Sequence, residues 1–287
     1  MRPARFALHR PTSLREALAL KAEFGDAATF HAGGTELLVA LKARVLHYDH
    51  VIDIKQVDEL RDIRILDDGT LSIGSLATHH VIANDPLVQQ LIPGYAHLSE
   101  HVANIRVRVA GTLGGVLCFA EPHADAPTML CALDARIVLA SATGQRTVSS
   151  RQFHVGEFAT AREDDELLVS IDVPPQLPSD KSAYRSFGHT ERPAVGVAAV
   201  WSPQGPQRLR LWVGAIVAVP GPLSGAQEAA ESLPPDAPFE EVWQALEPVI
   251  TADAEKIDAH DDLHGGADYK RHLITVLAQR ALQECMK

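Results

Sequence analysis

Helix-like and strand-like hydrophobic patterns take turns along the first 55 residues. Ser13 and Glu16 have the spacing of a capping box, and apolar residues then recur at helical intervals as far as Gly25. A Gly33-Gly34 pair marks a turn further on. The predicted elements are a helix over 13–25, a strand over 29–32, a helix over 37–42 and a strand over 51–54. Together they predict a small α/β unit that ends near residue 55.

Alternating patterns dominate the next part of the chain. Residues 63–74 alternate around an Asp-Gly turn, which predicts a hairpin, and residues 135–148 do the same around Thr143-Gly144. Helical segments are predicted between 78 and about 101, and a further strand over 166–173. These elements predict a second, larger α+β unit.

A proline-rich segment, residues 174–180, separates this unit from the rest of the chain. Its three prolines remove backbone donors and fix φ, so neither a strand nor a long helix continues through it. We therefore expect the main domain boundary there. The elements predicted beyond it are strands over 183–187, 195–201 and 209–219 and helices over 224–232, 239–250 and 268–286.

Composition and charge exclude several classes of function. The 287 residues carry 26 Lys+Arg against 37 Asp+Glu, and the formal net charge of −11 disfavours binding to nucleic-acid phosphates or anionic lipid. The cysteines Cys118, Cys131 and Cys285 form no close pair, so we expect no iron–sulfur cluster or metal site on this chain. With no apolar signal core and no run of about 18 apolar residues, a cytoplasmic protein is predicted.

Two glycine-rich segments are the strongest candidates for chemistry. Residues 32–36 (Ala-Gly-Gly-Thr-Glu) lie between a predicted strand and a predicted helix, where backbone N–H groups converge on an anion. Residues 110–115 (Ala-Gly-Thr-Leu-Gly-Gly) repeat this chemistry about 80 residues later. Either segment alone is also an ordinary tight turn, but two of them suggest one divided diphosphate ligand. Neither matches a Rossmann fingerprint or a P-loop, so a different nucleotide-binding fold is required.

Other candidates are less specific. Arg106 and Arg108 precede the second segment and either neutralise a diphosphate or face solvent or a partner subunit. Cys118 lies in an apolar run, where a thiol is more often a small buried hydrophobe than a redox group. Several histidines, among them His79, His80, His97 and His101, match no zinc spacing, so no metal site is predicted from them.

Taken together, these segments resemble the flavoprotein, or medium, subunit of the bacterial molybdenum hydroxylases, the carbon monoxide dehydrogenase and xanthine dehydrogenase family. The resemblance spans essentially the whole chain. It rests on residues 32–38, on Ile-Gly-Ser-Leu-Ala-Thr at 73–78, on Thr-Leu-Gly-Gly at 112–115 and on 120–135. Weaker matches follow the proline segment at 184–187, 192–198, 269–271 and 280–282.

The resemblance implies an α+β fold with a two-subdomain FAD-binding domain of the PCMH type, followed by a smaller α+β C-terminal flavoprotein domain. We place the FAD-binding domain at 1–175, with subdomains at about 1–55 and 56–175, and the C-terminal domain at 181–287. The resemblance also implies FAD as the cofactor of this chain and no catalytic acid or base on it. The implied cofactor-binding residues are Ala32, Gly33, Gly34, Thr35, Glu36, Leu37, Gly74, Thr78, Thr112, Gly114, Gly115, Val116 and Asp125.

The chain departs from the family pattern at two positions. Val116 stands where the family usually has Asn, so the hydrogen bonds of that amide are missing, although neighbouring backbone donors remain. Ser186 stands where family members often have Lys, and no flavin-facing residue of the C-terminal domain is therefore assigned.

By the same resemblance, this chain is an oxidoreductase subunit that passes electrons from partner iron–sulfur clusters through FAD to an external acceptor. Molybdopterin is expected on a large partner subunit and 2Fe–2S clusters on a small one, in a dimer of heterotrimers without nucleic acid or a membrane span. Two alternatives stay open: a free-standing FAD-dependent oxidoreductase, or a non-catalytic scaffold subunit whose flavin site has decayed. Bound flavin and co-purifying subunits discriminate among the three.

Overall fold

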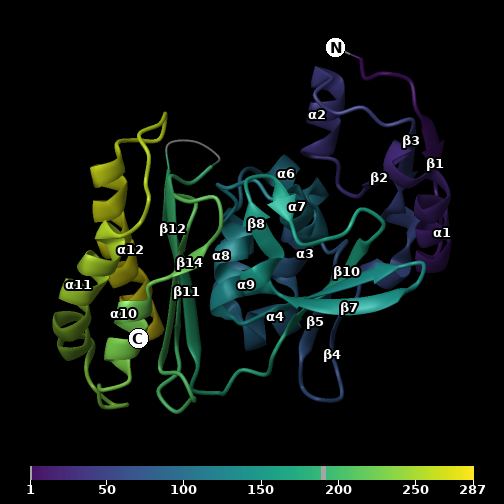
Figure 1. Ribbon diagram of the computed structural model, residues 1–287. Coiled ribbons are helices and arrows are strands. Elements are labelled where there is room, and N and C mark those ends of the chain that lie inside the picture. The colour runs from purple at the N-terminus through teal and green to yellow at the C-terminus, as the bar shows by residue number, and fades with distance from the viewer. Residues whose placement is uncertain (1, 189–191) are drawn as a thin grey trace.

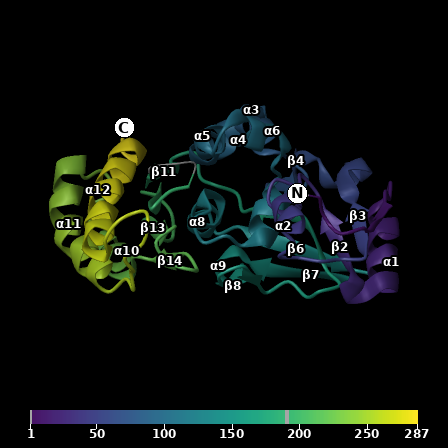
Figure 2. The same cartoon turned by 90° about the horizontal axis from the view of Figure 1, so that it is seen from above.

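The computed structural model describes residues 2–188 and 192–287. Three units follow one another across the molecule, with the N-terminal unit at one end and the C-terminal helices at the other (Figure 1). The view from above shows the same order (Figure 2). No helix in the described residues is long and apolar enough to cross a membrane.

The N-terminal unit is a three-stranded parallel sheet in the order β1-β3-β2. Its first helix begins as predicted, since the Ser13 hydroxyl accepts a hydrogen bond from the Glu16 amide. The edge strand β1 was not predicted because it is only three residues long and mostly exposed. The elements are β1 (Ala7–His9), α1 (Leu14–Phe24), β2 (Ala28–His31), α2 (Leu37–Ala43) and β3 (His50–Asp53).

The middle unit is built on a five-stranded antiparallel sheet in the order β4-β5-β10-β6-β7. Both predicted hairpins are present, as β4–β5 and β6–β7. Its strands are β4 (Ile63–Ile65), β5 (Leu71–Gly74), β6 (Arg136–Ser141), β7 (Gly144–Ser149) and β10 (Leu167–Val173), with a small pair β8 (His154–Gly156) and β9 (Ala159–Thr160) beside them. Its helices are α3 (His79–Asn84), α4 (Pro86–Leu91), α5 (Pro93–His101), α6 (Ile105–Ala110), α7 (Leu113–Phe119), α8 (Asp125–Ala132) and α9 (Ser150–Phe153).

The C-terminal unit is a four-stranded antiparallel sheet followed by helices. Its third strand ends at Gly214, earlier than the predicted 219, because Ala215 adopts a left-handed backbone with φ 64° that breaks the ladder. The elements are β11 (Lys181–Phe187), β12 (Val195–Trp201), β13 (Leu209–Gly214), β14 (Gly221–Pro222), α10 (Ser224–Ala230), α11 (Phe239–Glu255) and α12 (Ala267–Cys285).

The C-terminal sheet is buried on both faces, and every residue of β12 is buried. Val197 and Ala199 pack into one core with the helices α10–α12. Ala198 and Val200, which point the other way, share a second core with α5, α8 and the five-stranded sheet. The residues that the chain places after the proline segment therefore complete the core of the middle unit.

Candidate functional site

A cavity of about 400 Å³ opens where the first two units meet, and of the described residues in the C-terminal unit Arg192 lines its wall. Its volume falls in the range of roughly 300–1,000 Å³ typical of small-molecule sites. Most of the residues predicted to bind a cofactor line it: Ala32, Gly33, Gly34, Thr35, Glu36, Leu37, Thr112, Gly114, Gly115, Val116 and Asp125.

The two glycine-rich segments touch each other behind this cavity. A Cβ atom on Gly33 would lie 1.9 Å from the carbonyl oxygen of Ala110, so only glycine permits this approach. Gly34 has φ +75°, and a Cβ there would lie 2.5 Å from Nε2 of His31. The paired glycines thus let the chain turn sharply at the end of β2 and pack against the end of α6.

The first segment offers backbone donors to the cavity. In the described residues no acceptor is found for the amides of Gly33, Gly34, Thr35 and Glu36, although all four residues line the cavity. Buried or half-buried amides nearly always have a partner in a folded protein. A run of unpaired N–H groups beside a cavity is therefore suited to an anion such as a diphosphate.

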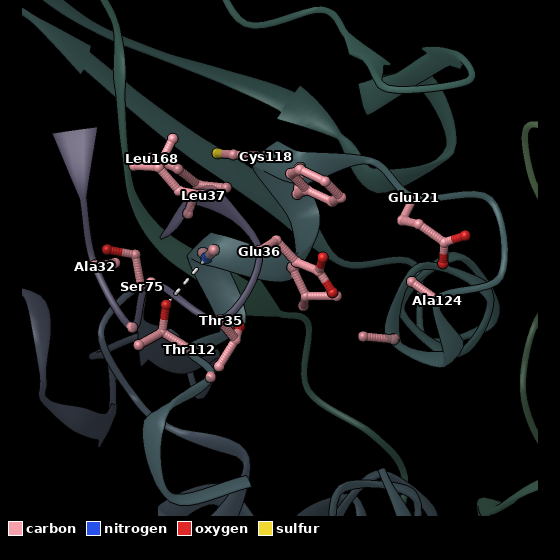
Figure 3. A pocket seen from close by; sticks show the side chains of 18 of the residues that line it. Ala32, Thr35, Glu36, Leu37, Ser75, Thr112, Cys118, Glu121, Ala124 and Leu168 are labelled. Atoms are coloured by element: carbon pink, nitrogen blue, oxygen red, sulfur yellow. Dashed lines mark hydrogen bonds between the residues drawn. The ribbon is translucent and has the colours of Figure 1, made fainter. Parts of the chain in front are cut away.

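Most amides of the second segment donate to partners within the protein, although the described residues supply no acceptor for that of Thr112. Thr112 caps α7, and its Oγ1 accepts a hydrogen bond of 3.1 Å from the amide of Gly115 (Figure 3). The amide of Gly114 donates to the carbonyl of Ser75 at 2.8 Å. A Cβ on Gly114 would lie 2.6 Å from Cβ of Ser75. This segment consequently gives the cavity a closely fitted wall, while most of the amides without an acceptor lie in the first segment.

Two of the predicted residues, Gly74 and Thr78, stand behind that wall and do not line the cavity. Gly74 ends β5, and a Cβ there would lie 2.4 Å from the carbonyl oxygen of Leu60. Thr78 caps α3 by accepting a hydrogen bond from the Val81 amide at 3.2 Å, and it forms a β-bridge with Thr112. Thr78 therefore supports the position of the second segment, whereas Gly74 packs against the backbone at Leu60.

Asp125 occupies a special position at the start of α8. It lines the large cavity and also a second cavity of about 180 Å³, whose other lining residues include His97, His101 and Tyr184. Burial raises the pKa of the Asp125 carboxyl to about 6. Near neutral pH this group therefore exchanges a proton more readily than an ordinary aspartate.

Arginines at the cavity are not those considered in the sequence. Arg106 and Arg108 are absent from the lining, and Arg108 donates to the carbonyl oxygens of Val102 and Ala103. Arg162 and Arg192 line the cavity instead. Both come from segments far from the glycine motifs, so no local pattern could single them out.

Among the other residues considered in the sequence are Cys118 and the histidines of α5. Cys118 lines the cavity, and burial raises the pKa of its thiol to about 11, so it stays protonated at neutral pH. Apolar side chains of Leu37 and Leu168 lie near it on one side of the cavity (Figure 3). His97, Glu100 and His101 on α5 bring their donor atoms within 4.8 Å of one another, but all three side chains are exposed.

Comparison with known proteins gives consistent matches over the chain. A family model described as the FAD binding domain in molybdopterin dehydrogenase matches residues 4–176. The carbon monoxide dehydrogenase medium chain of Hydrogenophaga pseudoflava is 31% identical over 284 residues, covering 98% of this chain and 97% of the relative. The xanthine dehydrogenase FAD-binding subunit of Escherichia coli O157:H7 is 27% identical over 285 residues, covering 97% and 95%. A solved structure of the Hydrogenophaga carbon monoxide dehydrogenase superimposes with a TM-score of 0.89 at 31% identity, covering 99% and 98% of the two chains.

Proposed function

Because this chain belongs to the family of FAD-binding domains of molybdopterin dehydrogenases, we propose that the cavity between its two glycine-rich segments is the place where it binds FAD. The chain is the FAD-binding medium subunit of a molybdenum-containing oxidoreductase. Its α+β fold is that of the carbon monoxide dehydrogenase medium chain.

The observation that carries the proposal is the row of amides at Gly33, Gly34, Thr35 and Glu36, for which the described part of the chain supplies no acceptor. A diphosphate has several oxygen acceptors and two negative charges, which such a row of N–H donors stabilises. Thr112 keeps its hydroxyl on the Gly115 amide and so fixes the opposite wall. We assign the diphosphate to the first segment and the shape of the site to the second.

Bound FAD supplies the redox chemistry, and the chain supplies binding, orientation and a dry environment. The apolar side chains of Leu37 and Leu168 line the site and exclude water from an aromatic ligand. Val116 lines it too, so an amide side chain is missing at this point and the backbone donors carry the polar contacts.

We further propose the assembly that this role requires. The relatives named as medium chains support a complex with a large and a small subunit. The three free cysteines lie in separate places, with Cys131 and Cys285 buried. That separation supports iron–sulfur clusters and molybdopterin on the partner subunits. A dimer of heterotrimers and an external electron acceptor complete the proposal.

The direct test is to purify the chain together with its partner subunits and to identify the released cofactor by mass. We expect one FAD for each copy of this chain, with additional iron–sulfur absorbance in the complex. The Gly34→Ala variant should lose most of its FAD, because φ +75° is strained by roughly 1–2 kcal/mol for a residue with a Cβ.

The Gly221→Ala variant is the matched control, since a Cβ at that glycine meets no atom within 4 Å. It should keep its full FAD content, and thermal unfolding should show that both variants are folded. A folded wild-type complex that contains no FAD and takes up none when it is added would contradict the proposal.

A further inference from the structure

The charges that line the cavity do not by themselves favour a diphosphate. Among the residues that the structure describes, four carboxylates line it, those of Glu36, Glu121, Asp125 and Glu166, against two guanidinium groups, those of Arg162 and Arg192. A dianion entering this space is repelled by any carboxylate that has no cation beside it. How the chain compensates these carboxylates therefore decides how well the anion binds.

Glu166 and Arg162 are engaged at one end of the cavity. Arg146 makes an ion pair with Glu166 through two hydrogen bonds of 2.5 and 2.8 Å. Arg162 donates to the main-chain carbonyls of Glu163, Asp164 and Glu166. Neither arginine forms an ion pair with Glu36 or Glu121.

Arg192 is the cation that contacts both remaining glutamates. Its guanidinium donates a hydrogen bond of 3.0 Å to Glu121 and lies 3.6 Å from the carboxylate of Glu36. Glu36 belongs to the first glycine-rich segment, and Glu121 follows α7; both side chains are labelled in Figure 3. One side chain thus connects three distant parts of the chain.

The main chain next to Arg192 is held in place. Nδ1 of His123 donates to the carbonyl of Pro193 at 2.9 Å, and the amide of Ala194 donates to the carbonyl of Phe187 at 2.7 Å. The Glu121 side chain is 11% exposed, so its charge is little screened by water. Removing the guanidinium would leave this carboxylate uncompensated at the wall of the cavity.

We propose that Arg192 is a charge-compensating residue of the FAD site, which neutralises Glu36 and Glu121 so that the diphosphate can bind beside them. This inference rests on the proposed function, because it concerns the same cavity. It makes Arg192 a positioning residue, and it requires no contact between the arginine and the cofactor.

The test measures FAD affinity in the full-length chain, using quenching of flavin fluorescence on binding to the cofactor-depleted protein. Arg192→Ala should weaken FAD binding by about five- to tenfold at low salt, and the loss should shrink as salt is added. Arg192→Lys should give an intermediate affinity, because it keeps the charge but not the planar fork. The triple variant Arg192→Ala/Glu36→Gln/Glu121→Gln should bind FAD within about twofold of the wild type, because it removes the carboxylates together with their cation.

Arg64→Ala is the matched control, since it also removes one positive charge from an exposed ion pair, with Asp62 at 3.2 Å, but away from the cavity. Its FAD affinity should equal that of the wild type. Unchanged affinity in Arg192→Ala, or a triple variant that stays as weak as the single one, would overturn the compensation by Arg192. If the wild type itself fails to bind FAD, the proposed function is wrong and this inference falls with it.

Discussion

Protonation of Asp125 makes the stability of the folded chain depend on pH. Burial raises the pKa of its carboxyl from 3.8 to about 6, so the folded chain retains a proton that the unfolded chain releases near pH 4. The stability that this group contributes is therefore full below about pH 4 and is lost as the pH rises to about 6. Above that range both states are ionised and no further change arises from Asp125.

We expect Asp125→Asn to remove this dependence. In the FAD-free chain, the unfolding free energy of the wild type relative to the variant should fall by about 1–3 kcal/mol between pH 4 and pH 7. Denaturant titrations at several pH values measure it. Asp236→Asn, at an exposed position, controls for the loss of one carboxylate from the net charge. A difference that stays flat across this range would show that Asp125 is not the group responsible.

At the scale of single residues, the sequence predicts the glycines of the cavity but not its arginines. Gly33 and Gly34 are recognisable because the turn they form is local, and the same is true of Gly114 and Gly115. Arg192 reaches Glu121 across 71 positions of sequence. Such a contact depends on how the units pack, which no short pattern encodes.

Helix α7 carries the second glycine-rich segment and ends in an unfavourable backbone. Its C-terminal neighbour, Ala120, is buried and adopts a left-handed conformation with φ 52°. Glycine adopts this conformation without the steric penalty of a Cβ. Ala120→Gly should therefore stabilise the chain by about 0.5–1 kcal/mol, measured by denaturant unfolding.

The matched control for that change is Ala252→Gly, at an exposed position inside α11. There the same substitution should destabilise the chain by about 1 kcal/mol, because glycine is a poor helix former. Loss of stability in both variants would contradict the explanation based on the left-handed conformation.

Elements with a clear period were predictable, and two short helices without such a period were not. The helix at 13–25 and both hairpins follow from periodicity and turn residues, and the structure has them at those positions. Helices α7 and α8 were missed because one is rich in glycine and the other is buried along its whole length after Asp125. Neither shows the polar face that marks an amphipathic helix.

At the scale of the whole molecule, the proline segment separates two sheets, but the core of the middle unit includes residues from both sides of this segment. Tyr184, Ala198 and Trp212 from the C-terminal sheet pack into the core of the middle unit. We propose that the division at 175 and 181 separates two units along the chain, although their side chains pack into a shared core. The sequence could place the linker, but it could not show which faces on either side of it pack together.

This shared core predicts a cost for any atom added between the units. A Cβ on Gly214 would lie 2.0 Å from Oγ1 of Thr128 on the buried helix α8. Gly214→Ala should therefore destabilise the chain by about 1–3 kcal/mol as the two units move apart. Thermal unfolding measures the effect, with Gly221→Ala as the control on the same sheet. Equal melting temperatures for the two variants would show that the contact between the units is loose.

The burial of β12 on both faces also affects how the chain folds while it is being synthesised. During synthesis at about 5–20 residues per second, the middle unit leaves the ribosome several seconds before Gly214 does. In that interval its apolar face over α5 and α8 has nothing to cover it. The nascent chain therefore exposes an aggregation-prone apolar surface for part of every round of translation. Slowing the ribosome after residue 173 should make folding of this chain more dependent on chaperones.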